Sequence, residues 1–478
     1  MTSPTSTRRW QALALLAATQ FVLILDTAIV IVAIPSMEVD LGFTTEELSW
    51  VANAYILAFG GLLLLGGRMS DIVGRRRMFI GGLVLFAAGS LLGALATAPL
   101  WLIIARATQG VGAAAVSPAA LALVMTLFTK PEERNKALGV WGSVAAAGAA
   151  PGYIIGGVLT EFFGWQAVLW VNVPIVAVVV ALAPRLLPEA KEDNHGSFDL
   201  AGAATLTAGI TLAVYATINA SDAGWTSGQT LGLFAVAAAL LIAFVAIEKR
   251  SSEPLIALDI FRIRSLRNGN ALTLLMQGAM TPMFFFLTLY LQHVLGFSPV
   301  QAGLAQMPAA LAFALLGTQV AKLVSRVGYH IPATVGGLIS GAGMFWLAQV
   351  DVNGAYFTDV LAPLTIAAVG ATLSVIALMI AATAEAPMDR AGLASGLVNV
   401  TQQLGGALGL AVLSTVAATA TLQATEQGAD ALASLTDGIS LALTVGACFA
   451  VATGVLSGLL LRKRSQAATA DAPAAPAV

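Results

Sequence analysis

The feature that most restricts the fold is a series of apolar segments long enough to cross a lipid bilayer as helices. A transmembrane helix needs about 20 predominantly apolar residues, and fourteen segments of the chain meet this requirement. They comprise residues 11–35, 48–66, 78–97, 100–128, 137–160, 166–187, 199–220, 230–247, 268–292, 301–322, 331–350, 359–384, 391–420 and 437–461. Asp, Glu, Lys and Arg make up only 10% of the 478 residues, whereas soluble domains contain about 25%. The sequence therefore predicts an all-α polytopic membrane protein with fourteen transmembrane helices and excludes a soluble globular fold.

Basic residues gather at alternate ends of these segments. Cytoplasmic loops of membrane proteins are enriched in Lys and Arg, and 22 of the 23 basic residues lie in the tails or in the loops after even-numbered segments. The loops on the other side contain acidic residues such as Glu38, Asp40 and Glu161. This pattern predicts a multi-pass protein of the cell (cytoplasmic) membrane with both termini cytoplasmic. Twelve spans plus a re-entrant pair in residues 199–247 would place the charges in the same way and stays open as an alternative.

The first six segments and the last six occupy similar lengths of chain, which suggests an internal duplication. We predict an N-terminal six-helix bundle in residues 1–187 and a C-terminal six-helix bundle in residues 268–464. Residues 188–267 would be an inserted pair, helices 7 and 8 with polar linkers, and residues 465–478 a disordered tail rich in Ala and Pro. Two six-helix bundles around a central cavity form the architecture of an alternating-access transporter.

Two charged residues, Asp26 and Arg106, lie well inside the predicted spans. Each costs about 2.5–3.5 kcal/mol on membrane-insertion scales, so an intramembrane charge indicates function by default. A carboxylate beside an arginine in a buried environment can bind a proton on one side of the membrane and release it on the other. The alternative is a permanent ion pair that orients two helices. Spacing along the chain does not show whether the two residues meet.

Polar residues within the spans are candidates for the lining of a substrate cavity. They are Asn53, Tyr55, Gln109, Gln277, Tyr290, Asn399, Gln402 and Gln403. Methionine and phenylalanine residues in 276–286 add soft and aromatic surface that suits bulky apolar or weakly cationic molecules. Taken singly, each of these residues is better explained by helix packing.

The chain lacks the residue patterns of cofactor and metal sites. Cys448 is the single cysteine, which excludes a disulfide framework and a multi-cysteine metal site. No Gly-x-x-x-x-Gly-Lys-Ser/Thr motif is present, and His195, His293 and His330 do not have metal-ligand spacing. The net charge of −2 gives no basic field for nucleic acid. We therefore expect no enzymatic activity, no cofactor, no metal and no nucleic-acid partner.

Four motifs occur along the spanning part of the chain. They are Leu25-Asp26-Thr27, residues 67–77, Arg106-Ala-Thr-Gln109-Gly110 and the glycine-rich segment 139–157. Together they resemble the motifs of the fourteen-helix drug:proton antiporters of the major facilitator superfamily, the multidrug resistance exporters, over nearly the whole spanning length. The first is similar to the helix 1 signature of this family, the second to the superfamily's helix 2–3 loop and the third to the helix 4 motif. The fourth resembles the antiporter motif of helix 5, with Tyr153 where the family has proline.

The resemblance implies a proton-coupled antiporter that exports lipophilic or cationic drugs or antibiotics by alternating access, with protons as the coupling ion. Asp26 and Arg106 would couple the proton. The cytoplasmic gate would be formed by Asp71, Gly74 and Arg75. The antiporter motif would comprise Gly139, Gly148, Pro151, Gly152, Gly156 and Gly157. We expect a functional monomer embedded in the lipid bilayer, with small lipophilic or cationic molecules as substrates.

Two other functions stay open. A dedicated exporter of one metabolite, such as a self-made antibiotic or a siderophore, would carry the same motifs. A non-transporting membrane sensor or structural protein is disfavoured, because the longest loop between spans, residues 248–267, is too short for a signalling domain.

Overall fold

The computed structural model describes residues 6–130, 133–134, 136–137, 140–141, 144, 149–189, 199–251, 254–387 and 390–461. Regular secondary structure in these ranges is helical, and no strand occurs within them. The first part of the chain forms α1 (Ser6–Leu41), α2 (Thr45–Val73), α3 (Arg75–Ala94), α4 (Pro99–Leu127), α6 (Ala149–Phe163), α7 (Gln166–Trp170) and α8 (Asn172–Leu186). Two helices follow, α9 (Leu200–Ala223) and α10 (Gly228–Arg250). The last part forms η1 (Leu258–Arg262), α11 (Arg264–Leu289), η2 (Tyr290–Val294), α12 (Pro299–Val327), α13 (His330–Leu347), η3 (Tyr356–Leu361), α14 (Ala362–Thr383), α15 (Ala391–Glu426) and α16 (Ala431–Leu460).

The predicted membrane-spanning segments correspond to these helices. Within the described ranges, twelve helical segments are long and apolar enough to cross a membrane. The predicted spans 137–160 and 331–350 correspond to α6, which is described from Ala149 onwards, and to α13, which has 18 residues. The predicted all-α, fourteen-helix membrane fold is therefore confirmed. The alternative of a re-entrant pair in residues 199–247 does not agree with the structure, because α9 and α10 have 24 and 23 residues. Each is long and apolar enough to cross a membrane.

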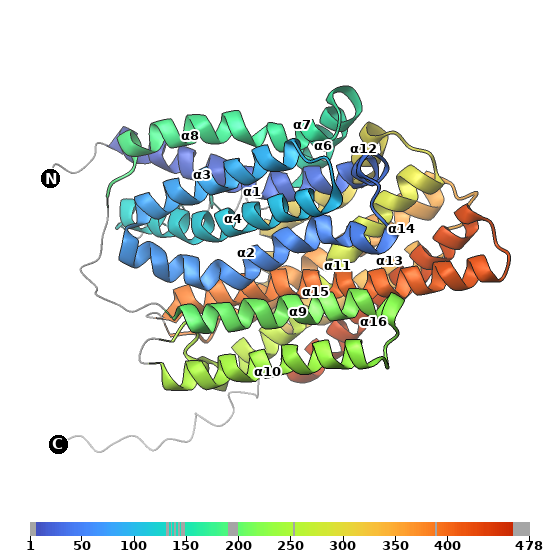
Figure 1. Cartoon of the computed structure of the whole chain (residues 1–478). Coiled ribbons are helices and arrows are strands. Elements are labelled where there is room, and N and C mark those ends of the chain that lie inside the picture. The colour runs from blue at the N-terminus through green and yellow to red at the C-terminus, as the bar shows by residue number, and fades with distance from the viewer. Residues whose placement is uncertain are drawn as a thin grey trace, which may run out of the picture.

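The long helices run nearly side by side, so the molecule has two distinct ends (Figure 1). We call the end with the connecting residues 74, 128–130, 187–189, 254–257, 328–329 and 384–387 the basic end. The opposite end, with the loops at 42–44, 95–98, 164–165, 224–227, 295–298, 348–355 and 427–430, is the acidic end. Described basic residues such as Arg75 and Lys130 lie at the basic end, whereas Asp40 and Glu47 lie at the acidic end.

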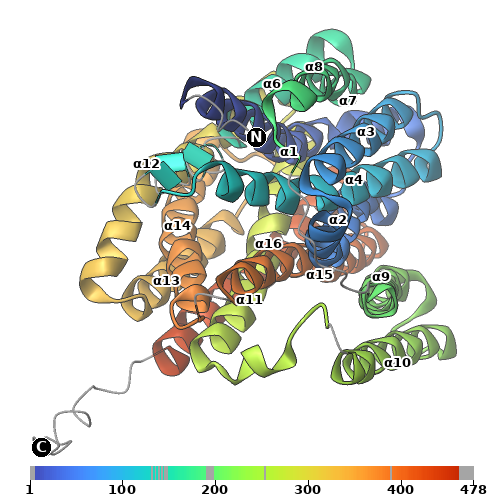
Figure 2. The same cartoon turned by 90° about the vertical axis from the view of Figure 1, so that its left-hand side faces the viewer.

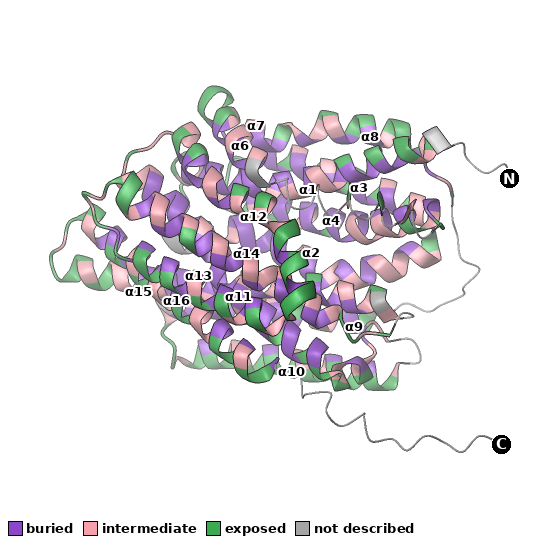
Figure 3. Cartoon of the chain, turned by 180° about the vertical axis from the view of Figure 1, so that it is seen from behind, coloured by how far each residue is buried: buried purple, intermediate pink, exposed green. Residues whose placement is uncertain are grey.

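The helices α9 and α10 lie beside the rest of the molecule, with α9 next to α2 and α15 (Figure 2). We call α1–α8 the first half and α11–α16 the second half. A hydrogen bond from Thr415 of α15 to the Thr217 carbonyl joins α9 to the second half. Many side chains of α10 are exposed, whereas the centres of α2, α4 and α11 are buried (Figure 3). This exposed apolar surface is what a lipid-facing helix requires.

Glycine lets α3 approach α4 closely in the first half. A Cβ atom added at Gly89 of α3 would lie 2.8 Å from the backbone nitrogen of Gln109 and 2.9 Å from the carbonyl oxygen of Ala105. Residues without a side chain allow membrane helices to pack backbone to backbone. The close approach brings the polar side chains of α3 and α4 within hydrogen-bonding reach of each other.

Candidate functional site

Asp26 of α1 and Arg106 of α4 form an ion pair inside the first half. Nη1 of Arg106 donates to Oδ2 of Asp26 over 2.7 Å. The side chains are 0% and 2% exposed, so neither charge is shielded by solvent. The sequence left open whether these residues meet, and the structure brings them together across 80 positions of chain.

The second oxygen of Asp26 accepts two further hydrogen bonds. Asn172 of α8 donates from Nδ2 over 2.6 Å, and Gln109 donates from Nε2 over 3.2 Å. Gln109 also accepts from Arg106 over 2.8 Å and donates to Ser90 of α3 over 2.7 Å. Both oxygens of the buried carboxylate therefore have hydrogen-bond donors. The ion pair is therefore the centre of a polar cluster to which α1, α3, α4 and α8 each contribute a side chain.

Arg106 has two further contacts with α2. Its Nε donates to the carbonyl oxygen of Val51 over 3.1 Å, and its guanidinium lies 4.5 Å from the centroid of the Tyr55 ring. A guanidinium above an aromatic face is attracted by the electrons of the ring, most strongly when water is excluded. Two residues predicted to line a substrate cavity, Tyr55 and Gln109, thus lie in direct contact with Arg106.

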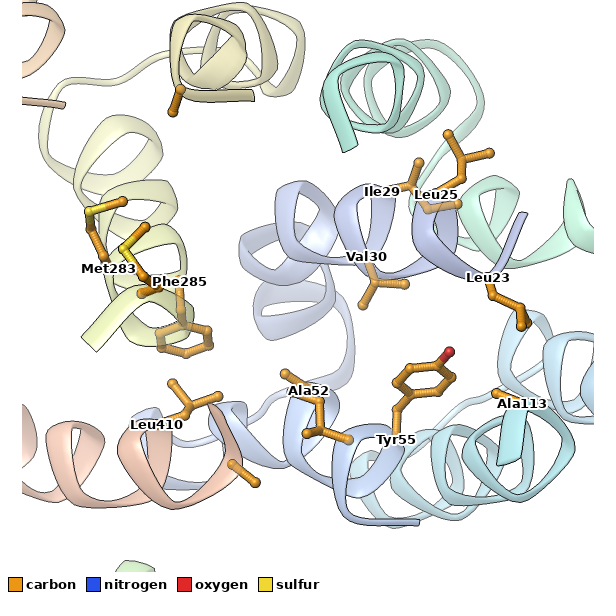
Figure 4. Packing of buried hydrophobic residues seen from close by; sticks show 14 of the residues in the cluster. Leu23, Leu25, Ile29, Val30, Ala52, Tyr55, Ala113, Met283, Phe285 and Leu410 are labelled. Atoms are coloured by element: carbon orange, nitrogen blue, oxygen red, sulfur yellow. The ribbon is translucent and has the colours of Figure 1, made fainter. Parts of the chain in front are cut away.

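A narrow cavity borders this cluster between the two halves of the molecule. The first half contributes Thr27, Val30, Tyr55 and Arg106 among others, and the second half contributes Thr281, Phe285 and Leu410. Figure 4 shows Val30 and Tyr55 facing each other across this region, with Phe285 and Leu410 to one side. In the present conformation the cavity has room for about one water molecule.

The described glycines of the antiporter motif pack α6 between α1 and α12. A Cβ atom at Gly152 would lie 2.6 Å from the Cβ of Ala28, and one at Gly156 would lie 2.7 Å from the Cα of Ile29. On the other side, a Cβ atom at Gly157 would lie 2.8 Å from the Cα of Val300 in α12. Both α1 contacts are within one helical turn of Asp26. Of the other motif residues, Pro151 is half-buried in α6, and Gly139 and Gly148 lie outside the described residues.

The predicted gate residues form a cluster at the basic end of the first half. Nη2 of Arg75 lies 3.2 Å from Oδ1 of Asp71, and its Nη1 donates to Thr126 of α4 over 2.6 Å. Gly74 separates α2 from α3 with φ 109°, a value that L-residues with side chains rarely adopt. These contacts connect α2, α3 and α4.

The remaining candidates for the substrate cavity are dispersed. Tyr290 is buried near the acidic end, and its hydroxyl donates to the carbonyl oxygen of Asp351 over 2.7 Å. Asn399 is exposed and donates to the Ser395 carbonyl of its own helix. Asn53 is fully buried, and neither atom of its amide has a hydrogen-bond partner among the described residues. These three residues do not converge on one place.

Three glutamines are the last of the residues predicted to line a substrate cavity. Gln277 and Gln402 are half-buried in α11 and α15. Gln403 packs against α2, since a Cβ atom at Gly60 would lie 2.7 Å from its Cβ.

Sequence reasoning missed two members of the polar cluster, Ser90 and Asn172. Ser90 is fully buried, as is Asn172. Asn172 is a polar amide in an otherwise apolar span, a signal that could have marked it. Ser90 has no distinguishing signal, because serine is common at the packed interfaces of membrane helices.

Among the described residues, four hydrogen bonds join the two halves at the acidic end. Gln292 of η2 donates to the Val32 carbonyl over 2.8 Å, and Nε2 of His293 lies 3.0 Å from Glu38. Glu161 accepts from the Ser298 hydroxyl over 2.6 Å and from the Val300 amide over 3.0 Å. The halves are therefore held together at this end.

At the basic end, η1 is joined to the residue that precedes α15 by an exposed ion pair. Arg390 donates to Oδ2 of Asp259 over 2.6 Å. This hydrogen bond lowers the pKa of Asp259 from its ordinary value.

Comparison with known proteins supports the same class of molecule. The family model described as the Major Facilitator Superfamily matches residues 16–410. The chain is 42% identical to the cephamycin export protein CmcT of Amycolatopsis lactamdurans over 428 residues, covering 88% of this chain and 87% of that protein. It is 40% identical to the puromycin resistance protein pur8 of Streptomyces alboniger over 481 residues, covering 98% and 95%.

Solved structures show the same fold. A bacterial homologue of the human lysosomal transporter Spinster, in an inward-facing and unoccupied conformation, superposes with a TM-score of 0.72 at 15% identity. The match covers 96% of this chain and 98% of that chain. The POT family transporter PepTSo superposes with a TM-score of 0.69 at 15% identity, covering 94% of this chain and 97% of that chain.

The helical membrane fold, the family model and the export-protein relatives together identify a membrane transporter. The chain belongs to the Major Facilitator Superfamily. The predicted family resemblance and the expectation of a transporter in place of an enzyme are both confirmed.

Proposed function

We propose that the protein is a proton-coupled antiporter that exports antibiotics or other lipophilic or cationic molecules across the cell membrane by alternating access. The observation that carries this proposal is the buried ion pair of Asp26 and Arg106 beside the cavity between the halves. Relatives named as a cephamycin exporter and a puromycin resistance protein support antibiotics as the substrate class.

Competition between a proton and the substrate for the Asp26 carboxylate would couple proton movement to substrate export. Asp26 carries a single negative charge, which can be neutralised by a proton, by Arg106 or by a cationic substrate. Leaving it unneutralised in a buried site is costly. Arg106 therefore neutralises the carboxylate when neither proton nor substrate is bound. Binding of a proton removes the attraction for a cationic substrate, so the proton and the substrate bind in alternation.

The helix α6 would transmit a movement of α1 beside Asp26 to the second half of the molecule. Its glycines contact α1 beside Asp26 on one face and α12 on the other. Because these contacts leave no space for a side chain, a movement of α1 displaces α6 or alters its contact with α12. The ring of Tyr153, 5.7 Å from that of Phe284 in α11, adds a second contact between the halves.

We place the basic end in the cytoplasm, in agreement with the bias of basic residues toward cytoplasmic loops. The hydrogen bonds between the halves at the acidic end would then close the outer side of the transporter. Both termini are cytoplasmic in this orientation.

The second candidate function is export of a single metabolite. The cephamycin export protein, with 42% identity, is named for one compound, and this favours a dedicated exporter as the alternative. Transport of chemically unrelated compounds would support the multidrug function, and transport restricted to one scaffold would support the dedicated one.

The decisive experiment uses purified protein in proteoliposomes with an imposed pH gradient and a fluorescent lipophilic cation. We expect gradient-driven transport by the wild type and its loss in Asp26→Asn. The matched control is Asp437→Asn, which removes an exposed carboxylate of α16 and should leave transport intact. Undiminished transport by Asp26→Asn would make Asp26 structural and reject this coupling site.

A further inference from the structure

A second, larger cavity lies at the acidic end, between the first half and the inserted helix α9. Its volume is about 690 Å³, within the range of about 300–1,000 Å³ typical of small-molecule sites. It shares no lining residue with the cavity beside Asp26. The walls come from the start of α2, the start of α4 and the end of α9, so this space requires the inserted helix pair.

The lining of this cavity combines a carboxylate with two aromatic rings. Glu47 is held at the start of α2 by a capping box, in which its Oε2 accepts from the Thr44 amide over 3.2 Å. The rings of Trp50 in α2 and Tyr215 in α9 lie 6.3 Å apart at 44°. A carboxylate next to aromatic faces is the usual recognition chemistry for an ammonium group.

The lining also offers a hydrogen-bond donor on α9, one helical turn after Tyr215. The amide nitrogen of Asn219 in α9 is buried and has no acceptor among the described residues, although the residue lines the cavity. A buried donor without an acceptor is costly, so a ligand that supplies an oxygen atom would be favoured here. Leu100 and Ile103 of α4 provide the apolar part of the lining, and Leu100 is 67% exposed, so the cavity is bordered by a side chain that faces the bilayer.

We propose that this cavity binds one phospholipid whose zwitterionic headgroup ends in an ammonium group, from the leaflet at the acidic end. Glu47 and the two rings would hold the ammonium, and Asn219 would donate to a phosphate or ester oxygen. An anionic phospholipid would bring a second negative charge toward Glu47. A simple lipophilic cation would leave the Asn219 donor unpaired. Trp and Tyr also gather at the membrane–water boundary, where the headgroup lies.

The test measures lipid binding to the full-length protein and needs no transport. Protein purified with phosphatidylglycerol is titrated with phosphatidylethanolamine of the same acyl chains, and bound lipid is counted by native mass spectrometry. We expect one phosphatidylethanolamine to bind at least about tenfold more tightly than added phosphatidylglycerol, the ratio expected from one hydrogen bond to a charged group. Equal binding of the two lipids would overturn the proposal.

Three variants locate the site. Glu47→Gln removes the charge but keeps a residue that supports a capping box, and Asn219→Leu removes the donor. Each should reduce the preference for phosphatidylethanolamine about tenfold. Glu426→Gln, which removes an exposed carboxylate at the same end outside the cavity, should retain it. Retention of the preference in both cavity variants would overturn the assignment.

A competitor and a second cavity variant keep the test decisive. Dodecyltrimethylammonium carries the cation and a tail but no phosphate, and we expect it to compete poorly. Competition as strong as that of phosphatidylethanolamine, unchanged in Asn219→Leu, would assign the cavity to lipophilic cations and reject the phospholipid. If Glu47→Gln does not fold, Tyr215→Leu, on the facing helix, tests the ammonium site in its place.

Discussion

Asn172 of α8 donates a 2.6 Å hydrogen bond to Oδ1 of Asp26, the oxygen that does not accept from Arg106. The carboxylate is thus connected to two helices: Oδ2 accepts from α4, and Oδ1 accepts from both α8 and α4. A change of protonation at Asp26 therefore alters contacts to α4 and α8 together.

Replacement of Asn172 by leucine tests this relationship. The variant loses a short hydrogen bond to a buried carboxylate, and we expect the free energy of unfolding to fall by about 1–3 kcal/mol, with slower gradient-driven transport. Thermal unfolding in detergent and proteoliposome transport measure the two effects. Thr160→Val is the control, because the buried Thr160 hydroxyl has no partner among the described residues and its loss should be neutral. Equal behaviour of the two variants would show that Asn172 does not support Asp26.

The ion pair predicts strong coupling between two substitutions. Removal of one charge leaves the other buried and uncompensated, so Asp26→Asn and Arg106→Gln should each lower the free energy of unfolding by about 3–5 kcal/mol. The double variant should recover most of that loss, since no unpaired charge is left. Unfolding of the four proteins gives the coupling energy. If the double variant loses the sum of the two single losses in the free energy of unfolding, the two side chains do not stabilise each other as an ion pair.

The contact between α6 and α1 predicts that Gly156→Ala is harmful. The added methyl group would lie 2.7 Å from the Cα of Ile29, which forces α6 away from α1. We expect a loss of about 1–3 kcal/mol in the free energy of unfolding and slower transport. Gly232→Ala in α10 is the matched control, since its Cβ would meet nothing within 4 Å. A Gly156→Ala protein as stable and active as Gly232→Ala would reject the tight contact.

The exposed pair of Asp259 and Arg390 predicts a pH-dependent contribution. Arg390 lowers the pKa of Asp259 from the ordinary value of 3.8. A carboxylate whose pKa is lowered by folding contributes stability above that ordinary value and loses it as the pH falls through the folded pKa. The difference in melting temperature between wild type and Arg390→Gln should therefore be present at pH 7, shrink once the pH falls below about 3.8, and disappear below the lowered pKa of Asp259. A difference in melting temperature that grows as the pH falls would contradict the lowered pKa of Asp259.

The orientation is tested by single-cysteine labelling in intact cells. With the exposed Cys448 replaced by serine, a membrane-impermeant maleimide should label Gln427→Cys at the acidic end. It should label Arg326→Cys at the basic end after permeabilisation and not before. The reverse pattern would place the basic end outside.

The sequence predicted the helices well, because a span of apolar residues is a local property that needs no knowledge of neighbours. Asp26 and Arg106 could be selected for the same reason, since a charge within such a span is conspicuous. Their contact could not be predicted, because it depends on how α1 and α4 pack. Ser90 and Asn172 belong to the cluster only through that packing.

Dependence on helix packing also explains why some residues predicted to line the substrate cavity lie far from it. Tyr290 and Asn399 have the polarity of cavity residues, but the structure uses the Tyr290 hydroxyl to hold the 348–355 loop and the Asn399 amide within α15. Composition identifies a polar group in a span, whereas its partner is a matter of three-dimensional arrangement.

The hairpin of α9 and α10 starts and finishes at the basic end, so it returns the chain to the face of the membrane that it left. An even number of crossings leaves the topology of everything downstream unchanged. A single extra crossing would have turned α11–α16 upside down relative to the first half. A hairpin is therefore the smallest spanning insertion that such a two-part molecule can accept between its halves without inverting one of them, and its peripheral position means that neither half has to be rebuilt around it.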